Sequence, residues 1–161
     1  MFFPPASGSG RNHGEVPVKK TTFGTYKDKP LEWLVLRKQE NVLTLISRHV
    51  FPTPLLTDEK PQLQDKKITK WLNRKFLPNI QGEVPAHARL LKQDEAKMLL
   101  EPDERCAYQI GMNKCEWWHL ASNNNKFAIV SDNGEILSRA NPYLGYVRPV
   151  IDIYTGENYG H

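Results

Sequence analysis

Two runs of mostly hydrophobic residues near the start of the chain, separated by a short polar segment, predict a β-hairpin. Residues 31–36 are Leu-Glu-Trp-Leu-Val-Leu and residues 42–47 are Val-Leu-Thr-Leu-Ile-Ser, while residues 37–41 are polar. Prolines at positions 52, 54 and 61 then predict an irregular segment up to residue 64, because proline lacks the backbone N–H that helices and strand ladders use.

Apolar residues recur at helical spacing over residues 65–77, which predicts an amphipathic helix. At about 100° per residue they span about 140° of the circumference, and basic residues occupy the opposite side. Asp65 is expected to cap the first turn. A second helix is expected over residues 93–100 and ends before Pro102. The apolar face of the first helix consists of Ile68, Trp71, Leu72 and Phe76.

Glycine and asparagine divide the second half of the chain into short strands. Asn133-Gly134 is the strongest hairpin signal, because Asn and Gly accept the positive φ angles of a type I′ turn. The order of elements, a hairpin, two helices and then several strands, predicts an α+β fold with two helices packed on a mostly antiparallel sheet. The expected strands cover residues 117–120, 127–131, 135–138 and 146–154.

The length of the chain suits a single domain. Residues 1–22 are rich in proline, glycine, serine and lysine and predict a flexible tail. We therefore expect one domain over residues 23–154, followed by a short C-terminal tail over residues 155–161.

Charge and composition exclude some classes of protein. The 161 residues include 22 lysines and arginines against 18 aspartates and glutamates, a formal net charge of +4. No segment approaches the roughly 20 consecutive apolar residues of a membrane-spanning helix, so we expect a soluble protein.

The segment Met1 to Ala6 lacks the basic and apolar regions of a secretory signal, so a cytoplasmic location is the default expectation. The linker-like segment Ser7 to Gly10 leaves an exported form open.

Five motifs occur in a distinctive order. They are Phe23-Gly24-Thr25-Tyr26, Leu31-Glu32-Trp33-Leu34-Val35-Leu36, Lys70-Trp71-Leu72-Asn73, Cys115-Glu116-Trp117-Trp118 and Gly145-Tyr146-Val147-Arg148-Pro149-Val150. With this order and spacing, residues 23–153 resemble a bacterial family of unknown function. That family is similar to the C-type-lectin-like and sulfatase-modifying-factor superfamily, which includes the formylglycine-generating enzymes. The resemblance implies a C-type-lectin-like fold, with adjacent N- and C-terminal strands and a long irregular loop region that binds ligands. Where the family has a third tryptophan followed by Leu-Arg-Ser-Pro-Gly, this chain has His119 to Asn124.

Aromatic and amide side chains in the late segments are the candidate binding residues. On a strand, Trp118 faces one side of the sheet while Trp117 and His119 face the other. One tryptophan is expected in the core; the other is either an exposed aromatic platform or structural as well. The amides and phenols nearby either contact a ligand or form turns. They are Asn123, Asn124, Asn125, Asn141, Tyr143 and Tyr146. The leading hypothesis is a non-catalytic binding module for a protein or glycan partner.

Other candidate chemistry rests on the two cysteines and on basic residues. Cys106 and Cys115 are either free thiols or a disulfide. Together with His119 they supply only three metal ligands without a paired Cys-x2-Cys spacing, so we expect no metal and no cofactor. Formylglycine-generating relatives use a cysteine pair in catalysis, so a modifying enzyme is one alternative. Weak binding of nucleic acid or another acidic partner to the basic side of the first helix is another. Arg148 is expected to be buried and paired with a carboxylate.

Overall fold

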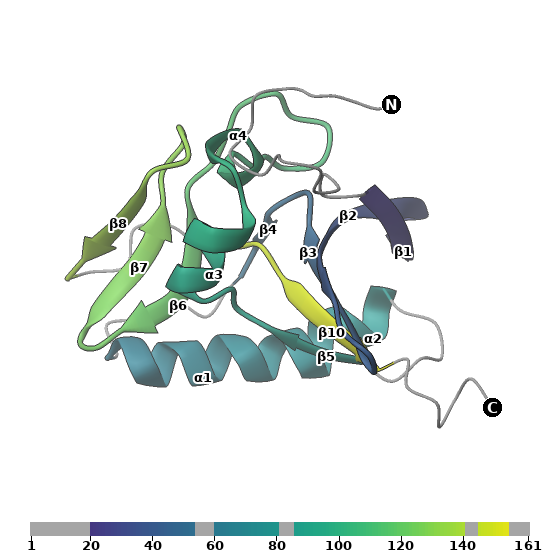
Figure 1. The fold of residues 1–161 in the computed structure, drawn as a ribbon, viewed down its shortest axis with the longest axis horizontal. Coiled ribbons are helices and arrows are strands. Elements are labelled where there is room, and N and C mark those ends of the chain that lie inside the picture. Colours follow the sequence, from purple (N-terminus) through teal and green to yellow (C-terminus); the bar gives the residue numbers. More distant parts are fainter. Residues whose placement is uncertain (1–19, 54–59, 81–85, 141–144, 155–161) are drawn as a thin grey trace.

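The computed structural model describes residues 20–53, 60–80, 86–140 and 145–154. It is an α+β structure with two five-stranded sheets that lie side by side and a long helix that runs along both of them (Figure 1). The first sheet has the order β1-β2-β3-β10-β5, formed by Lys20–Tyr26, Lys29–Lys38, Val42–Ser47, Val150–Tyr154 and Ala86–Arg89. The second has the order β4-β9-β6-β7-β8, formed by Phe51–Pro52, Tyr146–Val147, Trp118–Asn123, Lys126–Val130 and Ile136–Arg139. The α+β class predicted from the sequence is confirmed.

The predicted hairpin between the first two hydrophobic runs is confirmed, because β2 and β3 pair in antiparallel fashion. A further strand, β1, precedes it and pairs with the other side of β2 through a two-residue turn. Lys27 and Asp28 in that turn have φ angles of 50° and 67°, the conformation of a type I′ turn. Strand β1 begins at Lys20, three residues before the domain boundary expected at residue 23.

The expected adjacency of the N- and C-terminal strands is wrong. The last strand, β10, pairs with β3 on one side and with β5 on the other. The first strand, β1, lies at the edge of the same sheet, separated from β10 by β2 and β3. The two hairpins occupy both sides of β2, and β10 pairs with the side of β3 that they leave open, so β2 and β3 stand between the first and last strands.

The helical segment begins earlier than the sequence pattern predicts. Helix α1 (Pro61–Trp71) continues through a π-helical segment, Leu72–Phe76, into α2 (Leu77–Ile80). Pro61 stands at the start of α1, where proline is tolerated because the first backbone N–H groups have no partner within the helix. The prediction of irregular chain up to residue 64 is therefore wrong, and so is a capping role for Asp65, which lies inside α1. Ile68, Leu72 and Phe76 are buried, as the helical pattern predicts.

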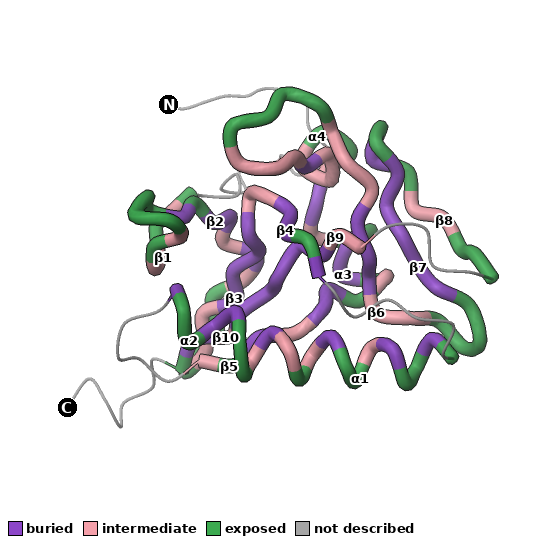
Figure 2. The backbone as a smooth tube through the Cα atoms, turned by 180° about the vertical axis from the view of Figure 1, so that it is seen from behind, coloured by how far each residue is buried: buried purple, intermediate pink, exposed green. Residues whose placement is uncertain are grey.

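The first sheet is buried on both faces. Leu31 and Trp33 pack with the helix in one apolar cluster, whereas Leu34 and Leu36 pack in a second cluster with residues of the second sheet and of α3 (Gln93–Leu99). Buried residues accordingly run along β3, β10 and β7 (Figure 2). Burial on both faces explains why the strand sequences are nearly continuous hydrophobic runs instead of strict alternations.

The Asn133-Gly134 hairpin forms, but its turn is not of type I′. Strands β7 and β8 pair in antiparallel fashion around this loop. Only Gly134 has a positive φ angle, +86°, and the N–H of Ser131 donates to the carbonyl of Glu135 at 2.8 Å. A Cβ atom at Gly134 would collide with the carbonyl oxygen of Pro102 in the short helix α4 (Pro102–Arg105). The glycine therefore allows this turn to pack closely against α4.

Arg148 is buried, as expected, and holds three parts of the fold together. Its side chain donates to the carbonyl oxygens of Ser47 at 2.6 Å and Glu104 at 2.7 Å, and it lies over the ring of Trp118 at 5.1 Å. Burial lowers the pKa of the guanidinium to about 10, and the nearby charge of Glu104 opposes that shift. Arg148 is therefore charged at neutral pH, and the hydrogen bonds named here go to backbone carbonyls.

Asn73 covers the free edge of the first sheet. Its side-chain Nδ2 donates to the carbonyl of Ala88 at 2.8 Å, and its Oδ1 accepts from the N–H of Ala88, also at 2.8 Å. This pair of bonds replaces the neighbouring strand that the edge strand β5 lacks. Nδ2 also donates to the carbonyl of Thr69 within the helix, so one amide ties the helix to the sheet.

Replacing Asn73 with alanine should lower the free energy of unfolding by roughly 2 kcal/mol, because both backbone groups of Ala88 lose their partner. Urea unfolding monitored by circular dichroism measures this difference. Asn79→Ala is the matched control, since Asn79 is exposed on the same helical segment and donates to the carbonyl of Lys75 one turn back. Equal stability of the two variants would show that Asn73 does not hold the sheet edge.

Candidate functional site

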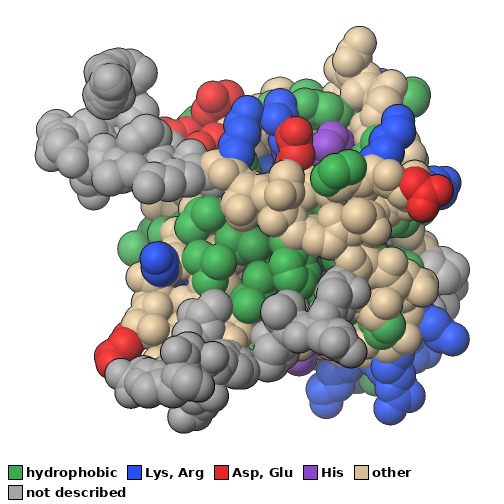
Figure 3. Space-filling model, turned by 90° about the vertical axis from the view of Figure 1, so that its right-hand side faces the viewer, with side chains coloured by type: hydrophobic (Ala, Val, Ile, Leu, Met, Phe, Trp, Pro, Cys, Tyr) green, Lys and Arg blue, Asp and Glu red, His purple; other side chains and the backbone are tan. Residues whose placement is uncertain are grey.

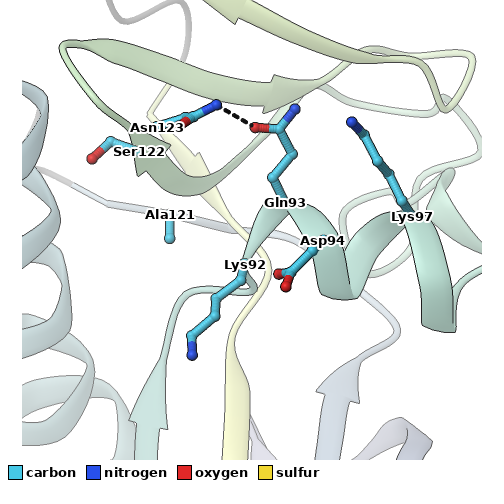
Figure 4. Close-up of a pocket in the computed structure, with 7 residues that line it drawn as sticks. All are labelled: Lys92, Gln93, Asp94, Lys97, Ala121, Ser122 and Asn123. Carbon is cyan, nitrogen blue, oxygen red and sulfur yellow. Dashed lines mark hydrogen bonds between the residues drawn. The ribbon is translucent and has the colours of Figure 1, made fainter.

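An open cavity of about 460 Å³ lies between the start of α3 and the end of β6. In Figure 4, Gln93 and Asn123 face one another across it, Lys97 rises beside Gln93, and Lys92 points in the opposite direction. The amide of Asn123 donates to Oε1 of Gln93 at 3.1 Å. We call this space the α3–β6 cavity. It is lined by Lys92, Gln93, Asp94, Lys97, Ala121, Ser122 and Asn123.

Backbone hydrogen bonds fix both walls of the α3–β6 cavity. The N–H of Ala121 in β6 donates to the carbonyl of Leu91 at 2.8 Å, which joins β6 to the segment before α3. The next residue, Ser122, is held by a different element: its N–H donates to the carboxylate of Asp65 in α1 at 2.6 Å. Burial raises the pKa of Asp65 above its usual range, while the bond from Ser122 opposes the rise.

A buried charge cluster holds the start of α3 in place. The Glu95 carboxylate accepts two bonds from Arg89, at 2.8 and 3.0 Å, and one from the N–H of Lys92 at 2.9 Å. Arg37 also pairs with Glu95. Arg89 in turn donates to Asp152 in β10 at 2.8 Å. Burial alone would raise the pKa of Glu95, but the bonds from Arg89 and Lys92 outweigh it and lower the pKa to about 2.

The lining of the α3–β6 cavity suits a polar ligand. Asn123, Gln93 and Ser122 can each donate and accept hydrogen bonds, which is what the hydroxyl groups of a ligand require. Two lysines against the single carboxylate of Asp94 give the lining a net positive charge. In the described parts of the chain, no three His, Cys, Asp or Glu side chains are grouped so that they could hold a metal ion.

Trp118 and His119 do not belong to a binding surface, which corrects the expectation for both. Trp118 is 0 % exposed, and its indole N–H donates to the carbonyl of Arg105 at 2.9 Å. His119 is 3 % exposed and packs edge-on against Phe127. The expectation that at least one tryptophan belongs to the core is confirmed. Trp118 is buried because it packs in the second apolar cluster with residues of β2, β3 and α3.

The remaining predicted binding residues are exposed or half-buried but do not form one surface. Trp117 is half-buried under the guanidinium of Arg139, at 5.4 Å from the ring centre. Asn123 lines the α3–β6 cavity, whereas the hydroxyl of Tyr146 accepts from Gln109 at 3.0 Å beside a different cavity. Asn124 and Asn125 are exposed in the β6–β7 turn, where Asn124 has a φ angle of +58°. Asn141 and Tyr143 lie outside the described residues.

The second cavity, of about 270 Å³, has a largely apolar lining that the sequence analysis did not identify. Hydrophobic side chains also gather at the centre of the face that lies on the right-hand side of Figure 1 (Figure 3). We call this space the β1–β4 cavity. Its lining residues are Tyr26, Lys27, Lys29, Val50, Phe51, Pro52, Gln109 and Ile110.

A group of polar side chains around His49 was also missed. Arg48 donates to Glu32 at 2.8 Å and to the hydroxyl of Tyr108 at 3.2 Å, and the ring of Tyr108 meets that of His49 edge-on. Within the described ranges, Nδ1 of His49 is buried without a hydrogen-bond partner. Burial, and then the charge of Arg48, lower the pKa of His49, so its imidazole is neutral at pH 7. No sequence motif connects these four residues, which come from three separate segments, Arg48 and His49 being neighbours.

The two cysteines are free thiols, and both are half-buried. Burial and then a hydrogen bond with Cys115 raise the pKa of the Cys106 thiol. This direction is opposite to that of an activated nucleophilic cysteine, whose pKa is lowered. The basic side of the first predicted helix is exposed in the structure, as the sequence pattern predicts; its residues are Lys66, Lys67, Lys70 and Arg74.

A scan of the chain against models of known protein families finds no match, and comparisons with curated proteins and with solved structures also find none. None of the helices in the described residues has the length and apolar character needed to cross a membrane.

Glu95 should make the stability of the protein depend on acidity. Its pKa of about 2 in the folded state lies below the ordinary value, so its stabilising effect is complete above about pH 5 and is lost as the pH falls towards 2. We expect Glu95→Gln to lower the free energy of unfolding by roughly 2 kcal/mol at pH 7 and by much less near pH 2.

Urea unfolding at a series of pH values tests this dependence. Glu135→Gln is the matched control, because Glu135 is an exposed carboxylate whose removal should change little at any pH. A constant difference between the wild type and Glu95→Gln from pH 7 to pH 2 would contradict the assignment.

Proposed function

We propose that this protein is a non-catalytic binding module and that the α3–β6 cavity binds an acidic glycan. The observation that carries the proposal is that residues with amide, hydroxyl and ammonium groups, from two separate elements, line one open cavity, where Gln93 and Asn123 face one another (Figure 4). The sequence analysis led to a binding module through Asn123, and the cavity brings Gln93 and Lys97 to that residue.

The lining favours a glycan because its polar side chains match vicinal hydroxyl groups. Asn123 and Gln93 bond to one another at 3.1 Å, and each amide has donor and acceptor capacity beyond that one bond. The cavity is open, which suits a polymer chain passing through it better than a small molecule that must be enclosed.

The lysines favour a ligand that carries negative charge. Lys92 and Lys97 stand on different sides of the cavity, and only Asp94 opposes them within the lining. Carboxylate or sulfate groups on a sugar would form charge-assisted hydrogen bonds with these ammonium groups. The firmly held walls reduce the ordering needed on binding, because Ala121 and Ser122 are fixed by bonds to Leu91 and Asp65.

The catalytic alternative has less support. A modifying enzyme that uses a cysteine requires a thiolate, and the raised pKa of Cys106 favours the protonated thiol at neutral pH. Binding of nucleic acid along the basic helix gains no specific support from the arrangement of the exposed lysines.

A glycan array followed by calorimetry with an oligogalacturonate tests the proposal. We expect binding that weakens as salt concentration rises, and a loss of about tenfold in affinity for Lys97→Ala and about fivefold for Asn123→Ala. Lys114→Ala and Asn125→Ala are matched controls, because both residues are exposed and neither lines the cavity. Binding to neutral glycans alone, or equal losses in cavity and control variants, would contradict the proposal.

A further inference from the structure

A short antiparallel pairing between the segments around Ala107 and Glu116 places the side chains of the two cysteines on the same face of the pair. Ala107 and Glu116 form an isolated antiparallel bridge, in which the N–H of Glu116 donates to the carbonyl of Ala107 at 2.6 Å. In antiparallel pairing the flanking residues fall opposite one another, Cys106 near Trp117 and Cys115 near Tyr108. Because side chains alternate along extended chain, both thiols project from the side opposite to Ala107.

The two thiols lie near one another, because the bridge places both on one face of the paired segment. After burial, the interaction that contributes most to the pKa of Cys106 is its hydrogen bond with the Cys115 side chain. Both cysteines are half-buried, so a small molecule can reach them from solvent. The thiol of Cys106 also contacts the carbonyl of Asp132 at 3.8 Å, a weak bond that it can give up.

The segment between the cysteines forms one wall of the β1–β4 cavity. Gln109 and Ile110 line that cavity, and Gln109 donates to the hydroxyl of Tyr146 at 3.0 Å. The segment is anchored at its start, where the carbonyl of Tyr108 accepts from the N–H of Val50 at 3.2 Å. It then reverses at Gly111, which has a φ angle of +81°.

We propose that Cys106 and Cys115 form a reversible disulfide, and that this bond restricts the motion of residues 107–114 under oxidising conditions. The bond would fix the segment at its far end, opposite the anchor at Tyr108, and so hold Gln109 and Ile110 in the wall of the β1–β4 cavity. In the reduced state hydrogen bonds hold this wall, from Gln109 to Glu116 and Tyr146 and from the N–H of Val50 to the carbonyl of Tyr108. The inference is independent of the proposed glycan binding, which uses the other cavity.

The chemistry requires an oxidant, and a low-molecular-weight disulfide such as oxidised glutathione supplies it. One cysteine, as thiolate, attacks the small disulfide, which forms a mixed disulfide and releases one small thiol. The second cysteine then attacks the protein sulfur of the mixed disulfide, so that the internal S–S bond forms and the second small thiol leaves. Two protein thiols are oxidised and one small disulfide is reduced to two thiols.

Equilibration of the protein with mixtures of oxidised and reduced glutathione, followed by alkylation and mass spectrometry, tests the proposal. We expect a species about 2 Da lighter that retains no glutathione and resists alkylation. Its Tm should be higher by roughly 5–10 °C, because the bond closes a loop of about ten residues in the unfolded chain. Amide hydrogen exchange over residues 107–114 should slow, which reports on the cavity wall directly.

Cys106→Ser and Cys115→Ser are the matched variants, and circular dichroism confirms that each has folded. Each should retain one glutathione and gain no thermal stability under oxidising conditions. Two glutathiones on the wild-type chain without an internal bond would overturn the proposal. So would an internal bond that leaves amide exchange over residues 107–114 unchanged, since the bond would then not act on the cavity wall.

Discussion

The arrangement of the molecule depends on burying both faces of the first sheet. Its central strands, β3 and β10, pair with each other and present alternate side chains to two separate apolar clusters. One cluster needs the helix that starts at Pro61, and the other needs α3 and the second sheet. Hydrophobic burial is roughly proportional to the apolar area removed from water, so neither the helix nor the second sheet can leave without exposing one of these faces.

Polar groups are found where these layers meet, and they satisfy backbone atoms that would otherwise be buried without partners. Asn73 provides an edge strand with both of its missing bonds, and Arg148 reaches the carbonyls of Ser47 and Glu104. Glu95 receives the backbone N–H of Lys92 at the start of α3 and neutralises Arg89 beside it. A buried donor or acceptor without a partner costs more than a single hydrogen bond contributes, so these side chains determine how the layers fit together.

The two cavities lie where the layered arrangement leaves its elements unable to pack fully. Most residues that line the α3–β6 cavity are polar or charged, because the cavity lies between a helix start and a strand end at the surface of the molecule. The β1–β4 cavity is largely apolar because its lining comes from strands whose neighbouring residues belong to the core, such as Phe51. These differences in chemistry suit different ligands, and only the polar cavity contains a residue that the sequence analysis had selected for binding.

Predictions for the candidate site were less accurate than those for the secondary structure. The tryptophan pair attracted attention because consecutive aromatic residues are unusual, yet packing in the second apolar cluster buries Trp118 completely. Lys92, Gln93 and Lys97 had no motif of their own, because a solvent-exposed lysine or glutamine near a helix start is common. They belong to a candidate site because Asn123, about thirty residues later in the chain, bonds to Gln93 and completes the lining of the cavity.

The sequence by itself determined the local elements: the β2–β3 hairpin, the apolar face of the long helix, α3 and the β7–β8 hairpin all follow from periodicity and turn residues. It did not reveal the turn at Lys27 and Asp28, because lysine is not typical of positive φ angles and the turn contains no glycine. Only the tertiary structure decided the strand order, the burial of Trp118 and His119, and the meeting of α3 with β6. The physical reason is that periodicity records which side of an element is apolar, whereas the choice of partner for that side depends on contacts between residues far apart in the chain.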